Sequence, residues 1–161
     1  MVIVTVVAAL ILIFSFIGGL TQGLVKSFFS VVTFIVAVPV AGLYYQSSAG
    51  WLGFLHNQIY QNFLGFFIIM AIVSIILSII FYFPRKIMEK AWHEAFWIKL
   101  IAGLLNLLAA AMGLVILTTM VTVFPVWEWL RLSLADSSII SWLMAHLTFV
   151  QSLLPGVLRF P

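Results

Sequence analysis

Lys26 is the only charged side chain in the first 84 residues of the sequence. Over the whole chain of 161 residues, 65% are hydrophobic and 7% are charged. Soluble domains carry about 25% charged residues, so a soluble fold of this length could not cover its surface with water-compatible side chains. The sequence therefore predicts a chain whose main solvent is the lipid bilayer.

Four segments are long and apolar enough to cross a membrane, which takes about 20 mostly apolar residues. They cover residues 2–20, 27–45, 62–83 and 98–124. No basic stretch precedes the first segment, so we expect it to be retained as a span rather than cleaved as a signal peptide. The predicted fold class is all-α: a polytopic membrane helix bundle with four transmembrane helices and amphipathic interfacial helices, forming a single membrane domain over residues 1–161.

The basic residues predict how these spans are oriented. Lys26 lies between the first and second spans, Arg85, Lys86 and Lys90 lie between the third and fourth, and Lys99 lies at the start of the fourth, on the same side. These two connections must share one side of the membrane, and basic connections favour the cytoplasm. We therefore expect both termini outside the cytoplasm, with Lys26 holding the first turn inside and Arg85, Lys86 and Lys90 contacting the inner leaflet.

Two glycines in the first connection have two interpretations. Gly19 and Gly23 are four residues apart, a spacing that allows two helices to approach closely. A tight turn between helices also needs residues that accept a positive φ. We favour the turn, because isolated pairs of this kind are common in apolar helices.

Residues 84–97, PRKIMEKAWHEAFW, alternate polar and apolar pairs every four positions, which is typical of an amphipathic helix. Arg85–Glu89 and Lys90–Glu94 have the spacing of helical ion pairs. We expect this cytoplasmic helix to lie on the inner leaflet, drawn to anionic lipid. Docking of a cytoplasmic partner is the alternative.

The C-terminal region, residues 126–161, is predicted to be interfacial. Asp136, Ser137 and Ser138 form a helix start signal for a helix over residues 139–154. Its length is near the lower limit for a span. We prefer a helix lying in the outer interface or packed on the bundle, and a fifth span is the alternative.

Asn106 is the deepest strongly polar side chain in the predicted spans. Gly103, Ala110 and Gly113 make a smooth strip near it. An amide that bonds across two membrane helices contributes roughly 0.6–2 kcal/mol. We therefore expect these four residues to serve helix packing rather than substrate contact.

No pattern in the sequence supports an enzyme. His93-Glu94 lacks the second histidine of a metalloprotease motif, and residues 136–138 with His146 match no hydrolase elbow. There is no cysteine, no phosphate-binding glycine loop and no carboxylate pair in a span. We expect no catalytic residues, no metal site and no cofactor. We also expect no nucleic-acid partner, because the charged residues are too sparse to form a nucleic-acid-binding surface.

The stretch QGLVKSFFSVVTFIVAVPVAGLYY resembles the first cytoplasmic turn and second span of the CvpA family, the colicin V production proteins. The matching positions are Gly23, Lys26, Ser30, Ala41, Tyr44 and Tyr45. Gln22 and Ser27 stand where the family usually has Arg and Glu, and Thr5 stands where it usually has Asp. In the last span Gly103 is kept, but the family's arginine near Ala110 is lost.

The resemblance implies a small multi-pass protein of the bacterial inner membrane, with a role near export or envelope upkeep. It implies no agreed reaction. The leading hypothesis is a non-enzymatic subunit or scaffold that packs against other membrane chains, as a homo- or hetero-oligomer. The alternative is a component of a transport pathway for a small solute or peptide, to which Pro39 and Asn106 would contribute.

Overall fold

The computed structural model describes residues 2–91 and 95–154. Four long apolar helices, each able to cross a membrane, are α1 (Val2–Gln22), α2 (Leu24–Ala49), α3 (Gln58–Ile80) and α5 (Phe96–Val123). The shorter helices are η1 (Gly50–Leu52), α4 (Tyr82–Ala91), α6 (Glu128–Ala135), α7 (Ser138–His146) and α8 (Thr148–Ser152). The predicted all-α membrane class is confirmed, and each long helix overlaps one predicted span.

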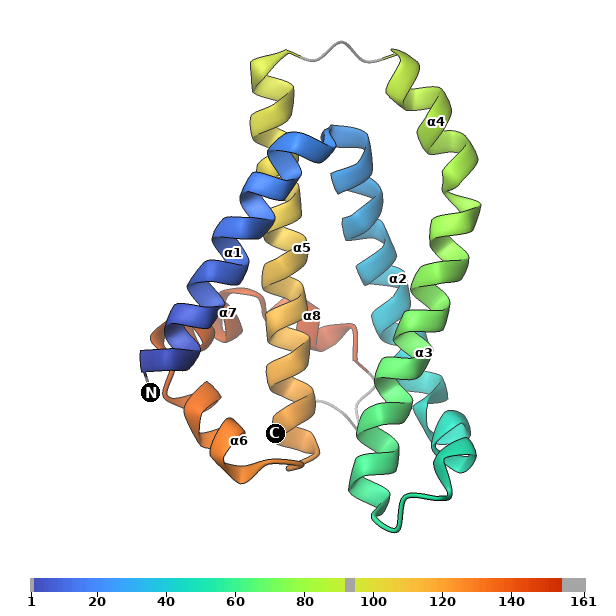
Figure 1. Ribbon diagram of the computed structural model, residues 1–161, viewed down its shortest axis with the longest axis vertical. Coiled ribbons are helices and arrows are strands. Elements are labelled where there is room, and N and C mark those ends of the chain that lie inside the picture. The colour runs from blue at the N-terminus through green and yellow to red at the C-terminus, as the bar shows by residue number, and fades with distance from the viewer. Residues whose placement is uncertain (1, 92–94, 155–161) are drawn as a thin grey trace.

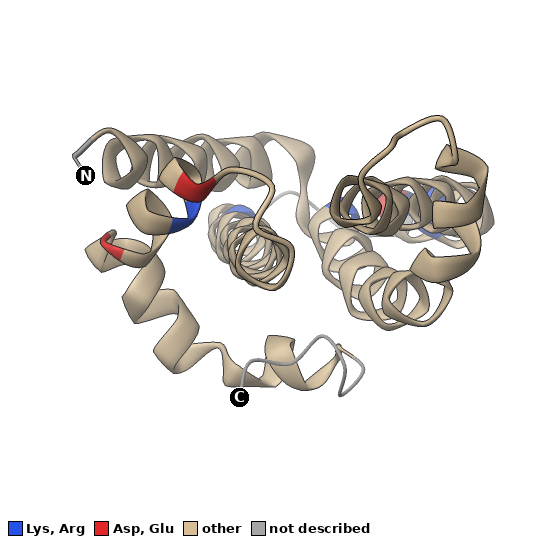
Figure 2. Cartoon of the chain, turned by 90° about the horizontal axis from the view of Figure 1, so that it is seen from below, with Lys and Arg blue, Asp and Glu red and all other residues tan. Residues whose placement is uncertain are grey.

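The four long helices form an open row in the order α1, α5, α2, α3 (Figure 1, Figure 2). α5 packs against α1 and α2, and α2 packs against α3, but α1 and α3 are not packing neighbours. In a closed four-helix bundle the outer helices would also meet. The row therefore leaves the side between α1, α2 and α3 uncovered by a fourth helix.

The two ends of the row differ in charge. One end carries the α1–α2 turn, α4 and the start of α5 (Figure 1). We call it the cationic end, because it holds Lys26, Arg85, Lys86, Lys90 and Lys99. The opposite end, called the tail end, carries the beginning of α1, the α2–α3 connection and α6 (Figure 1).

Gly19 brings the backbones of α1 and α5 into contact near the cationic end. A Cβ atom at this position would lie 2.6 Å from the carbonyl oxygen of Ala102 and 2.8 Å from the Cα of Gly103. Any side chain would force the helices apart, because both obstacles are backbone atoms. Gly19 thus serves close packing, which was the less favoured of its two interpretations.

Gly23 has the conformation that the turn interpretation requires. Its φ is 85° and its ψ is 162°, a region that is essentially restricted to glycine. A Cβ there would meet nothing within 4 Å, so the requirement is conformational rather than steric. One residue thus joins α1 to α2.

Gly65 allows close packing between α2 and α3, as Gly19 does between α1 and α5. A Cβ at Gly65 would lie 2.8 Å from both Ser48 Oγ and the carbonyl oxygen of Tyr45. The buried Ser48 hydroxyl donates to the Gly65 carbonyl at 3.0 Å. A small residue and an interhelical hydrogen bond therefore fix this pair as well.

Many large buried side chains gather toward the tail end. They come from α2, α3, α5 and the C-terminal helices: Tyr45, Phe66, Met112, Ile116, Met120, Phe124, Val150 and Leu154. The Tyr60 hydroxyl closes this region by donating to the Val126 carbonyl at 3.1 Å. This packing fills the space among α2, α3 and the C-terminal part of α5.

The predicted helix over residues 84–97 is wrong in its bounds. α4 begins two residues earlier and follows α3 after Phe81, which itself keeps a helical conformation. Pro84 explains the break, because it has no N–H to donate to the carbonyl of Ile80 in a continuous helix. Ala95 has an extended conformation before α5 begins, so the aromatic residues after it belong to α5.

One of the two predicted ion pairs of this segment is present. Arg85 Nε donates to Glu89 Oε1 at 2.9 Å. The predicted partner of Lys90, Glu94, lies outside the described residues, as do Trp92 and His93.

The single helix predicted over residues 139–154 is also wrong. The chain forms α7 and α8, separated at Leu147, and neither is long enough to span a membrane. The buried residues Ile140, Leu143, Val150 and Leu154 lie against the bundle. The break at Leu147 lets the tail curve around α5 (Figure 2), which a straight helix could not do.

The α1–α5 crossing gives a test with a matched control. Gly19→Ala should lower the free energy of unfolding by about 1–3 kcal/mol, because its methyl group collides with backbone atoms. Gly18→Ala should leave stability unchanged or raise it, because a Cβ at Gly18 meets its nearest atoms at 3.6 Å and alanine favours helix. Thermal unfolding of both variants in detergent measures the difference. Equal stability of the two variants would contradict the close backbone contact between α1 and α5 at Gly19.

Candidate functional site

Two adjoining cavities line the open side of the row, and together we call them the polar groove. The outer cavity, about 280 Å³, lies at the cationic end among α1, α2, α3 and α4. The inner cavity, about 370 Å³, lies deeper among α1, α2 and α5. Ser30 and Phe34 of α2 line both cavities, so the groove is continuous along that helix.

The outer cavity has a mixed lining with many polar groups. Its polar lining residues are Gln22, Lys26, Ser30, Thr33, Ser74, Ser78 and Arg85. The hydroxyls of Thr33 and Ser78 donate to carbonyls of their own helices at 2.8 Å and 2.7 Å. Within the described ranges the hydroxyls of Ser30 and Ser74 have no hydrogen-bond partner, so both are available to a ligand.

Lys26 and Arg85 bring two positive charges to the outer cavity. Arg85 donates a hydrogen bond to Glu89 through its Nε, so its two terminal guanidinium nitrogens do not bond to Glu89. Lys26 has no acidic partner in the part of the chain that the structure describes. The cavity therefore combines an excess of positive charge with free hydroxyls.

The inner cavity is lined mainly by small and apolar side chains around Asn106. The Asn106 side-chain Nδ2 donates to the Ser15 carbonyl of α1 at 2.6 Å. Ala109, Ala110 and Gly113 of α5 line the same cavity. The amide thus bonds across α1 and α5, and the small residues beside it leave space at mid-membrane depth.

The predicted site residues fall into four places. Asn106, Ala110 and Gly113 line the inner cavity, whereas Gly103 lies at the α1–α5 crossing. Lys26 and Arg85 line the outer cavity. Lys86 and Lys90 are exposed on α4, and Lys86 lies over the ring of Tyr82 at 5.8 Å.

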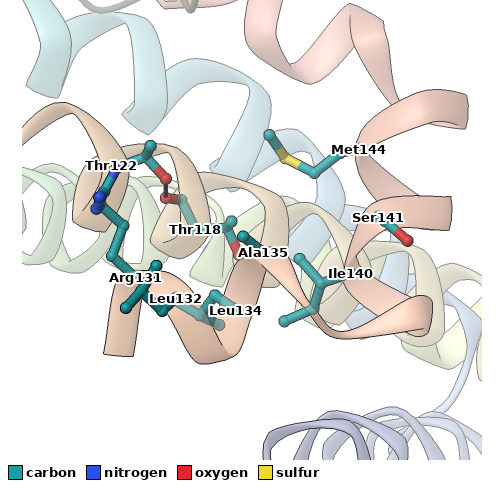
Figure 3. A pocket seen from close by; sticks show the side chains of 9 residues that line it. All are labelled: Thr118, Thr122, Arg131, Leu132, Leu134, Ala135, Ile140, Ser141 and Met144. Atoms are coloured by element: carbon teal, nitrogen blue, oxygen red, sulfur yellow. Dashed lines mark hydrogen bonds between the residues drawn. The ribbon is translucent and has the colours of Figure 1, made fainter. Parts of the chain in front are cut away.

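A further cavity of about 310 Å³ lies between α5 and the helices α6 and α7. Figure 3 shows Arg131 extending from α6 toward Thr122 of α5, with Met144 and Ser141 on α7. Glu128 accepts a hydrogen bond from Arg131 and raises the pKa of its guanidinium. Sequence reasoning missed this cavity; the Glu128–Arg131 spacing was its one local signal.

The candidate triad residues are not assembled. Ser137 Oγ accepts a hydrogen bond from Thr5 Oγ1 at 3.0 Å, and His146 stacks on Trp142 with a ring separation of 4.3 Å. In residues 2–91 and 95–154 no hydrogen bond joins His146 to Ser137 or Asp136. The same ranges contain no group of three His, Asp or Glu residues placed to hold a metal ion.

The family model described as colicin V production protein matches residues 4–148, a range that runs from α1 to the first residue of α8. The chain belongs to the colicin V production protein family. No curated protein and no solved structure matches it.

This match confirms the predicted resemblance. The matched range includes every residue that lines the polar groove. Thr5 stands where the resemblance predicts an aspartate. Its hydroxyl bonds to the fully buried Ser137. This neutral pair ties α1 to the tail without placing a charge beside the membrane core.

The Asn106 bond yields a second test. Asn106→Ala should lower the free energy of unfolding by about 0.6–2 kcal/mol, because α1 and α5 lose an interhelical hydrogen bond. Asn62→Ala is the control, because the Asn62 side chain is partly exposed and has no partner in the described ranges; its effect should stay within about 0.5 kcal/mol. Unfolding in detergent measures both, and similar losses would show that the Asn106 bond contributes nothing specific.

Proposed function

We propose that this CvpA-family chain is a non-enzymatic subunit of a membrane complex that packs a helix of another membrane protein into its inner cavity. The observation that carries the proposal is the strip of Ala109, Ala110 and Gly113 beside Asn106, on the side of the row that α1 and α3 leave open. Small residues allow helix backbones to approach in lipid, and an amide supplies an added hydrogen bond.

The chemistry of the described residues supports a non-catalytic role. The polar groups of the inner cavity are the amide of Asn106 and the hydroxyls of Ser15 and Ser30. None of these side chains is charged, and no general base stands beside either hydroxyl among the cavity's lining residues. We accordingly propose no catalytic residues and no cofactor.

The cellular setting is part of the same proposal. The family's description links it to colicin V production. We extend this to a role near export or envelope upkeep in the bacterial inner membrane, with the cationic end in the cytoplasm and both termini outside. The five basic residues gathered at one end support this orientation.

Cross-linking tests the packing role directly, because the chain has no native cysteine. Ala110→Cys places a thiol in the inner cavity, and Ile75→Cys places one on the exposed face of α3. In native membranes a thiol cross-linker should give a discrete adduct with another chain from residue 110 and none from residue 75. A strictly monomeric particle with no adduct from either position would contradict the proposal.

A transport component is the second candidate, because polar groups line the groove from Lys26 to Asn106. Flux into sealed proteoliposomes distinguishes the two functions. Transport requires solute movement that Asn106→Leu reduces, whereas a packing subunit gives no flux across a broad panel of solutes and peptides.

The orientation has its own test. Lys90→Cys and His56→Cys place thiols at exposed positions on opposite ends of the row. A membrane-impermeant maleimide should label residue 56 from outside intact cells, and residue 90 only after the cytoplasmic side is opened. Labelling of residue 56 solely from the cytoplasmic side would reverse the assigned orientation.

A further inference from the structure

The outer cavity collects cationic side chains from two different helices. Lys26 comes from the first turn of α2, and Arg85 comes from α4, just beyond the end of α3. Both line the same cavity of about 280 Å³. The sequence distance between them hides this convergence, which arises because the α1–α2 turn and α4 share the cationic end (Figure 1).

The charges around this cavity do not balance. Two like charges that face one small cavity disfavour each other. Glu89 pairs with Arg85, but the outer cavity itself has no acidic lining residue, and Lys26 has no acidic partner in the described ranges. An anion placed between the two cations would relieve the repulsion.

The remaining lining groups suit an anion that carries an apolar body. The free hydroxyls of Ser30 and Ser74 can donate to its oxygens. Phe29 and Phe81, whose ring centroids lie 4.8 Å apart, form an apolar part of the lining. Below them the groove continues past Phe34 toward mid-membrane.

We propose that the outer cavity is a binding site for the phosphate group of an anionic membrane lipid, held by Lys26 and Arg85. Charge-assisted hydrogen bonds from the ammonium and guanidinium groups hold the phosphate oxygens. The hydrocarbon chain of the lipid lies along the aromatic lining. The site adjoins the inner cavity, to which the packing function is assigned, but Lys26 and Arg85 line the outer cavity alone, so the two proposals can fail separately.

The position of the cavity selects a lipid over free phosphate. Lys26 and Arg85 lie where the long apolar helices reach the cationic end, which is the level of lipid headgroups. The cavity also opens into the groove along α2 rather than being polar on every side. A soluble phosphate ion would gain nothing from Phe29, Phe34 and Phe81.

Charge-matched variants separate this site from general attraction to the membrane. Lys26→Gln and Arg85→Gln each remove one charge from the cavity. Lys86→Gln removes the same charge from the neighbouring residue on α4, which lies over Tyr82 and outside the cavity. Lys26→Arg keeps the charge and serves as the conservative variant.

The experiment uses the delipidated full-length chain in neutral detergent, titrated with phosphatidylglycerol, phosphatidylcholine or inorganic phosphate. Native mass spectrometry measures bound lipid, and thermal unfolding shows that each variant is folded. Phosphatidylglycerol should bind in preference to phosphatidylcholine. Lys26→Gln and Arg85→Gln should each weaken its binding about tenfold, whereas Lys86→Gln and Lys26→Arg should stay within about twofold of the unaltered chain.

Three results would overturn the proposal. Equal weakening by all three glutamine variants would show diffuse attraction instead of a site. Undiminished phosphatidylglycerol binding in folded Lys26→Gln and Arg85→Gln would show that neither side chain holds the lipid phosphate. If inorganic phosphate stabilised the protein against thermal unfolding at the same concentration as phosphatidylglycerol, the cavity would be a site for a free anion.

Discussion

The backbone contact between α1 and α5 at Gly19 and Gly103 determines how the other helices can pack. Within lipid, helices gain no hydrophobic drive toward one another, so close packing and interhelical hydrogen bonds decide which pairs form. Gly19 allows the close packing of α1 on α5, and Asn106 supplies an interhelical hydrogen bond to the Ser15 carbonyl. Because α1 is held on α5, it cannot close the row against α3, and one side of the molecule stays open.

The open row divides the molecule into two halves with different physical character. Toward the tail end, Phe66, Met120 and Phe124 fill the space between helices, and the curved tail covers α5. Toward the cationic end α1, α2, α3 and α5 contribute to a groove lined by hydroxyls, an amide and two cations. Polar groups at membrane depth are costly unless they have partners. The groove is therefore the part of this CvpA-family chain to which both the proposed packing role and the proposed lipid site are assigned.

The sequence predicted the class, the four long helices and the grouping of basic residues, because each depends on composition and on segment length. It did not predict the row, because apolar helices carry little information about which neighbour each one chooses. Gly19 shows the difficulty: its spacing from Gly23 allowed packing or a turn, and only the position of Ala102 in space decides between them.

The errors have similar causes. The helix predicted to begin at residue 84 begins at Tyr82 instead, and Pro84 explains the break after α3. The start signal at residues 136–138 predicted one helix over residues 139–154, but the chain breaks at Leu147 and follows α5. The meeting of Lys26 and Arg85 in one cavity depends on tertiary structure alone.

Water access along the groove tests the central claim most directly. Ser30→Cys lies on both cavities, Ile75→Cys is exposed on α3 outside the groove lining, and Val38→Cys is fully buried. A thiol reacts as the thiolate, which forms only where water reaches it. A small charged thiol reagent added from the cationic end of the protein in nanodiscs should modify residue 30 much faster than residues 75 and 38. Equal rates at residues 30 and 75 would mean that the open side is ordinary lipid-facing surface and that the polar groove does not exist.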